Sequence, residues 1–285
     1  SAYINNSFVS DKLHFYYDRP SAFDDFFHKI RMRADLKNSV FDSQDLGRFA
    51  PEMYAINERY ELNASMKGRY VDLTFDNFDL KFGKNSYLKG DVNFKGFPDL
   101  KKTVTDLKLK PSLLVANDLK QYSKNAEYQK YITKIEQLNL SGTYKGVYDD
   151  FVMKADLQSK NLGKVNGLIN VKIGNGADDV TYFGNIDATN FELGKFIDDP
   201  EALQTISFKG EIKGDGFKLT GSTIELDGEV ASIGFNGYNY KNIVVDGKLG
   251  KSVFDGFVDI KDPNLTADVS GRVDFNKELN SFKIV

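Results

Sequence analysis

Apolar and polar residues alternate along most of this chain, and residues 265–275 show the pattern most clearly. From Leu265 to Phe275 every odd position is apolar or glycine, and every even position is hydroxylated or charged. Side chains on a β-strand point alternately to the two faces of its sheet, so this period of two predicts a strand with one apolar and one polar face. Similar alternation occurs along residues 30–36, 60–68, 138–144, 165–173, 206–212, 224–230, 243–249 and 254–260.

Turn residues separate the alternating segments. Examples are Gly214-Asp215-Gly216, Asn236-Gly237 and Asp262-Pro263-Asn264. Short strands that recur about every ten residues between such turns are typical of an all-β antiparallel meander. Glycines such as Gly210 and Gly228 stand at apolar positions of these segments. Glycine weakens a strand, so we expect either a bend of the sheet or a close approach of another backbone at these positions.

Three segments depart from this pattern. Residues 113–131, which follow Pro111, fit a short helix better than a strand. Residues 46–53 and 193–197 fit single helical turns, each close to a proline.

The chain also repeats itself over a long range. Asp45-Leu46-Gly47-Arg48-Phe49 resembles Glu192-Leu193-Gly194-Lys195-Phe196, and the strands predicted after each segment align with one single-residue shift. Such self-similarity indicates an extended repeat architecture rather than a closed globule.

Composition removes several classes of function. The net charge of −3 and the pI of about 5.6 give no electrostatic argument for nucleic-acid binding. The chain has no cysteine, and its two histidines, His14 and His28, lie near the N-terminus without an acidic cluster at ligand spacing. No serine motif, phosphate loop or calcium loop is recognisable. The sequence therefore predicts no enzyme, no metal and no cofactor, and no apolar run approaches the roughly 20 residues of a membrane-spanning helix.

The apolar faces remain as the informative feature, and they allow three interpretations. They could form the closed core of a β-sandwich or barrel. They could form the lipid-facing surface of an outer-membrane barrel, although the chain has no tryptophan and no recurring aromatic girdle. They could also line an open groove on a long curved sheet.

Several segments of the C-terminal hundred residues resemble the TamB family and its AsmA-like relatives. The resemblance lies in residues 188–196 with the Asp-Pro-Glu-Ala-Leu that follows, and in residues 210–216, 234–247 and 254–265. It implies a long periplasmic protein of a Gram-negative bacterium, anchored in the inner membrane by an N-terminal helix. It also implies a sheet folded lengthwise into a taco-like trough, similar to bridge-like lipid transfer proteins, and an outer-membrane barrel of the TamA or BamA type as partner.

We therefore expect an all-β fold: an elongated, curved antiparallel sheet that forms a trough with an apolar interior and carries a few short helices. We expect a first trough segment over residues 1–187, with the helical insertion near 113–131, and a continuous second segment over residues 188–285. The predicted groove residues all lie at apolar positions of the second segment. They are Ile206, Phe208, Ile212, Phe217, Leu219, Ile224, Leu226, Val230, Ile243, Val245, Phe254, Val258, Ile260, Leu265, Ala267, Val269, Val273 and Phe275.

The predicted function is that of an internal segment of a TamB-like bridge, which guides phospholipid acyl chains between the inner and outer membranes. An alternative is an assembly factor that pairs a sheet edge with strands of outer-membrane proteins or with a TamA- or BamA-type barrel. A further alternative is a non-catalytic β-sandwich that binds another molecule.

Overall fold

The computed structural model describes residues 2–10, 12–48, 51–97, 99, 101–174, 179–216, 222–250, 253–274 and 283–284. The chain forms two compact units, Ser1–Tyr148 and Asp149–Val285. The division that the sequence suggested, between residues 187 and 188, lies inside strand β12 (Val180–Glu192).

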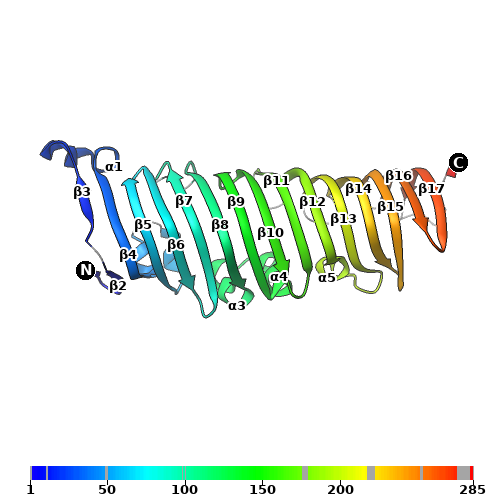
Figure 1. Cartoon of the computed structure of the whole chain (residues 1–285), viewed down its shortest axis with the longest axis horizontal. Coiled ribbons are helices and arrows are strands. Elements are labelled where there is room, and N and C mark those ends of the chain that lie inside the picture. Colours follow the sequence, from blue (N-terminus) through cyan, green and yellow to red (C-terminus); the bar gives the residue numbers. More distant parts are fainter. Residues whose placement is uncertain are drawn as a thin grey trace. The chain divides into compact units, whose positions relative to one another are not determined.

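The first unit is an antiparallel sheet in which each long strand pairs with the next one along the chain (Figure 1). Three short strands precede it: β1 pairs with β2, and both β2 and β3 pair with β4. The strands are β1 (Ala2–Ile4), β2 (Ser7–Val9), β3 (His14–Tyr16), β4 (Arg31–Asp42), β5 (Arg59–Arg69), β6 (Asp72–Phe82), β7 (Ser86–Lys95), β8 (Val104–Val115) and β9 (Gln137–Val147).

The second unit follows the same plan. Each strand again pairs antiparallel with its successor, and among the described residues β10 pairs with neither β17 nor β18. The predicted fold class, an open antiparallel sheet with short helices, is therefore confirmed. The strands are β10 (Asp150–Ser159), β11 (Gly163–Ile173), β12 (Val180–Glu192), β13 (Leu203–Asp215), β14 (Thr223–Phe235), β15 (Tyr238–Gly250), β16 (Val253–Asp262), β17 (Leu265–Asp274) and β18 (Lys283–Ile284).

The helices are short and lie between strands. The insertion predicted over 113–131 begins later than expected, because Leu113 and Leu114 still belong to β8. Pro111 also lies within β8, at a register irregularity between Leu109 and Ser112, where its missing N–H is tolerated. The helices are η1 (Pro20–Asp25), α1 (Phe26–Lys29), α2 (Ser43–Leu46), η2 (Pro51–Ala55), α3 (Ala116–Leu119), η3 (Lys120–Tyr122), α4 (Ala126–Ile135) and α5 (Leu193–Ile197).

A helix follows β4, β8 and β12, which is every fourth strand. The two similar segments of the sequence overlap equivalent helices, since Asp45 and Leu46 lie in α2 and residues 193–196 lie in α5. The long-range repeat therefore corresponds to a structural one. The ends of β4, β8, β12 and β16 recur at intervals of about seventy residues, and each block contains an even number of long strands.

Asparagines interrupt the alternation in three long strands. Asn38 in β4, Asn77 in β6 and Asn190 in β12 have φ values of 52°, 48° and 47°. The register shifts beside each of them, as it does between Ala188 and Phe191. Asparagine adopts this left-handed conformation more readily than other residues with a side chain, and one extra residue in a strand forms a β-bulge. The bulge lets apolar residues three positions apart lie on the same face.

Each unit contains one cluster of buried apolar side chains that pack against one another. In the first unit Ala22, Ile30, Met32 and Leu73 pack together, so the segment containing η1 and α1 covers part of the apolar face of the sheet. In the second unit the cluster consists of Phe208, Val230, Ile243 and Val245.

Candidate functional site

The apolar face of the second unit is the candidate site, and the strand register arranges its side chains in four rows across β10–β17. Each row contains one residue from each of the eight strands, and no row contains a charged side chain. The rows are Leu157, Val165, Ala188, Phe208, Val230, Ile243, Ile260 and Ala267; Ala155, Gly167, Ile186, Gly210, Gly228, Val245, Val258 and Val269; Met153, Ile169, Gly184, Ile212, Leu226, Gly247, Gly256 and Gly271; and Phe151, Val171, Tyr182, Gly214, Ile224, Leu249, Phe254 and Val273.

Thirteen of the predicted groove residues fall in these rows and one more, Ile206, packs against the buried cluster of the same face. Most of the predicted residues are partly exposed, and four of them are buried: Phe208, Val230, Ile243 and Val245. Leu265 is 39% exposed at the start of β17. Phe217, Leu219 and Phe275 lie outside the residues that the structure describes.

Glycines bring neighbouring backbones close together on this face, as the sequence suggested. A Cβ atom at Gly210 would lie 2.2 Å from the carbonyl oxygen of Asp227 and 2.7 Å from the Cα atom of Gly228. It would also lie 2.9 Å from Cζ of Phe208, whose ring therefore takes up the space above the glycine. Aromatic rings lie in the same way beside Gly247, where Phe254 is the neighbour. Gly210 and Gly247 are therefore sites of close packing, whereas a Cβ atom at Gly271 would meet nothing within 4 Å.

Within the four rows, one side chain carries a polar oxygen or nitrogen atom, and it is a tyrosine. Tyr182 lies in the fourth row, beside Gly214. Burial, and secondarily the charge of Asp215, raises the pKa of Tyr182 above its ordinary value of 10.0. The phenol is therefore neutral at physiological pH, and the four rows carry no charge.

Sequence reasoning missed the contribution of β10–β12 to this site. Those strands supply the first three members of every row, although the predicted groove began at Ile206. The alternation of Met153, Ala155 and Leu157 was visible in the sequence. The sequence did not reveal the strand register, in which Ala188 lies opposite both Val165 and Phe208. The bulge at Asn190 shifts the register between β12 and β13 just beyond Ala188.

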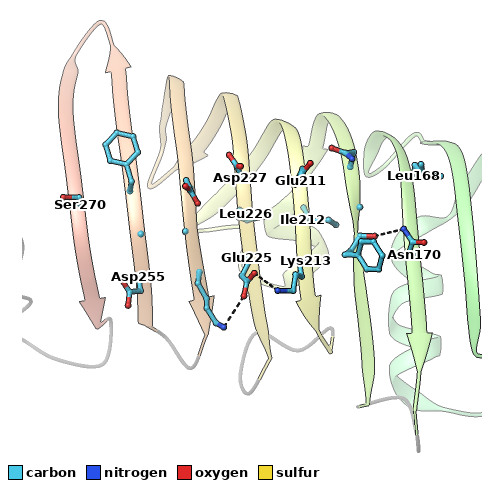
Figure 2. Close-up of a pocket in the computed structure, with 18 residues that line it drawn as sticks. Leu168, Asn170, Glu211, Ile212, Lys213, Glu225, Leu226, Asp227, Asp255 and Ser270 are labelled. Atoms are coloured by element: carbon cyan, nitrogen blue, oxygen red, sulfur yellow. Dashed lines mark hydrogen bonds and ion pairs between the residues drawn. The ribbon is translucent and has the colours of Figure 1, made fainter.

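The opposite face of the same sheet carries a broad hollow of about 920 Å³ (Figure 2). Of the predicted groove residues only Ile212 and Leu226 belong to its lining. Most of the lining consists of residues at the polar positions of the strands, including Glu211, Asp227 and Asp246. The hollow is therefore a second feature, separate from the apolar rows.

Charge in the hollow is arranged around Glu225. Its carboxylate accepts hydrogen bonds from Nζ of Lys213 at 3.0 Å and Nζ of Lys248 at 3.2 Å (Figure 2). These two bonds hold the pKa of Glu225 below its ordinary value of 4.5. Both lysines are thus engaged by one carboxylate.

Within the described part of the chain, no group of three or more histidine, cysteine, aspartate or glutamate side chains could hold a metal ion. Nδ1 of His28 lies 2.6 Å from Oδ1 of Asp25, three residues earlier in the chain, and this contact is exposed to solvent. No helix among the described residues is long and apolar enough to cross a membrane. Comparisons with protein-family models, curated proteins and solved structures found no match.

Proposed function

We propose that the second unit guides phospholipid acyl chains along its apolar rows, as part of a TamB-like bridge in the periplasm of a Gram-negative bacterium. The observation that carries the proposal is the continuity of the four rows across eight strands. With strands about 4.8 Å apart, the rows extend over roughly 34 Å. An extended acyl chain lying across the strands would meet apolar side chains along its whole length.

The partial exposure of these side chains supports a bound apolar molecule. Most of the row residues outside the buried cluster keep some contact with solvent. Each methylene group that leaves water contributes about 0.8 kcal/mol, so one acyl chain could gain several kcal/mol on this face. The same arrangement has no specific polar contact to hold the chain at one place, which favours movement along the rows.

The partners follow from this proposal and from the TamB resemblance. They are phospholipid acyl chains, an outer-membrane barrel of the TamA or BamA type, and the inner membrane through an N-terminal anchor. No catalysis, metal or nucleic acid enters the proposed function.

Native mass spectrometry of the protein purified from a bacterial host tests the proposal. We expect the wild-type chain to carry phospholipid. Val269→Asp places a carboxylate in the second row, at a partly exposed position of β17. We expect this variant to keep its β-sheet circular dichroism and to lose bound phospholipid, because an acyl chain would have to pass a charge.

The matched control is Thr266→Asp, which adds the same carboxylate to the polar face of the same strand. This variant should retain phospholipid at the wild-type level. A wild-type protein free of phospholipid, or equal loss in the two variants, would contradict the proposal. A captured outer-membrane protein segment paired with a strand edge would instead favour the assembly function.

A further inference from the structure

We propose that the hollow on the polar face of the second unit docks the basic face of an α-helix from a partner protein. The surface is open and partly apolar: Phe183 on β12 is 58% exposed and Leu168 on β11 is 48% exposed, and both line the hollow. Large exposed apolar side chains that gather in a concave region commonly mark an interaction surface.

Charge selects the kind of partner. Glu211 lies directly opposite Asp227, and Asp227 lies directly opposite Asp246, so three carboxylates stand side by side on β13, β14 and β15. Figure 2 shows Glu211 and Asp227 next to each other on adjacent strands. Like charges directly opposite one another destabilise a sheet. A basic partner would remove this repulsion.

The lysines of the hollow do not compensate this row. Lys213 and Lys248 both bind Glu225, in the neighbouring row. Among the described residues, Glu211, Asp227 and Asp246 form no ion pair. These three carboxylates are therefore available to bind basic side chains of a partner protein.

Spacing favours a helix over an extended segment. The three carboxylates follow the strand spacing of about 4.8 Å, perpendicular to the strands. Basic residues three or four positions apart on a helix have Cβ atoms about 5–6 Å apart, whereas residues on one face of an extended segment recur every ~6.8 Å. The long side chains of lysine and arginine can take up the remaining difference. A helix lying across β13–β15 can thus present one basic residue to each carboxylate, and an apolar residue one turn further to Leu168 and Phe183.

Fluorescence anisotropy with two labelled peptides of identical composition tests this inference. The first is an alanine-rich helix with lysines at positions i, i+4 and i+7 and a leucine one turn beyond. The second distributes the same lysines around the helix. At about 50 mM salt, where screening is weak, we expect the full chain to bind the first peptide at least about tenfold more tightly than the second.

Two triple variants locate the binding. Glu211→Gln, Asp227→Asn and Asp246→Asn together should weaken binding of the first peptide about tenfold or more. Asp156→Asn, Asp187→Asn and Asp268→Asn remove the same charge from a neighbouring row of the same face, and should change binding less than about twofold. The single change Phe183→Ser should also weaken binding although it alters no charge.

Equal binding of the two peptides, equal weakening by the two triple variants, or no binding to the wild type would overturn the inference. Neither peptide needs lipid, and the wild type should bind the first peptide whether or not phospholipid co-purifies. An absence of bound phospholipid would therefore not change the expected peptide binding, and an absence of peptide binding would not change the expected phospholipid content.

Discussion

The carboxylate of Asp118, in α3, binds Ser86 at the start of β7. Its Oδ2 atom accepts hydrogen bonds from the backbone N–H of Ser86 at 3.0 Å and from its hydroxyl at 2.8 Å. The same carboxylate also accepts from the backbone N–H groups of Lys84 and Asn85. One buried side chain thereby fixes the turn between β6 and β7 to the helix that follows β8. Asp45, in α2, binds Asn5, Asn6 and Ser7 between β1 and β2 in the same way.

Asp118→Ala should lower the free energy of unfolding of the first unit. The change leaves three backbone N–H groups and a hydroxyl without their acceptor, and an unsatisfied buried donor costs about 1–3 kcal/mol. Hydrogen exchange should report faster opening at the amides of Lys84 and Ser86. Asp106→Ala is the control, because Asp106 is only partly buried and forms an ion pair with the exposed Lys145 at 3.5 Å. Equal exchange rates in the two variants would contradict the assigned role.

Stability should depend on pH through the same carboxylate. Burial alone would raise the pKa of Asp118, but the hydrogen bonds from Lys84, Asn85 and Ser86 hold it below its ordinary value of 3.8. A lowered folded-state pKa contributes stability that is fully present above the unfolded value and is lost as the pH falls through the folded value. The difference in urea midpoint between wild type and Asp118→Asn should therefore shrink below about pH 4. A constant difference down to pH 2.5 would oppose this assignment.

The same substitution at two adjacent valines of β15 should lower the stability of the second unit by very different amounts. Val245 is 8% exposed on the apolar face, whereas Val244 is 41% exposed on the polar face. Val245→Asp buries an unpaired carboxylate and should cost several kcal/mol, enough to abolish cooperative folding of the unit. Val244→Asp should keep the wild-type melting temperature within a few degrees. Similar melting of the two variants would show that the apolar face is not packed as described.

Gly210→Ala should destabilise the second unit by about 1–3 kcal/mol, because the added Cβ atom would meet the backbone of Asp227 and Gly228 and the strands would have to move apart. Gly250→Ala provides the comparison. There the nearest atoms are Oγ1 of Thr223 at 3.0 Å and the carbonyl oxygen of Ser222 at 3.5 Å, so a small side-chain movement makes room. Urea unfolding followed by circular dichroism should rank Gly210→Ala as the less stable variant, and the reverse order would be evidence against close packing at the glycines.

Asn190 offers a test of the bulge. Its φ of 47° favours glycine over alanine, so Asn190→Gly should be more stable than Asn190→Ala by about 1 kcal/mol. At Asn185, in a regular part of the same strand, alanine should be at least as stable as glycine. The two pairs of variants therefore predict opposite orders in thermal melting. The same order at both positions would show that residue 190 does not need the left-handed conformation.

The strands were predictable because each alternation of apolar and polar residues depends on local sequence alone. Val269 and Phe208, for example, lie on the apolar face where the alternation put them. Register was not predictable, because it depends on pairings between residues distant in the sequence. The sequence around the Asn190 bulge gives a local indication of it, since Ala188 and Phe191 are apolar and three residues apart with an asparagine between them. However, the backbone N–H of Asn190 donates to the hydroxyl of Ser207, which lies on the next strand and could not be identified from the sequence. The hollow could not be predicted either, because residues from all the strands β11–β17 line it and their register was not known.

The short helices after β4, β8 and β12 mark blocks of four strands, and these blocks bear on how the length of such a chain can change. Four antiparallel strands return the backbone to the end of the sheet from which it started, so a whole block can be gained or lost without reversing the direction of the strand that follows. Each block would alter the extent of the sheet by roughly 19 Å and would leave the apolar side chains on their original face. A single added strand would invert every later strand, whereas duplication or deletion of about seventy residues would preserve both faces.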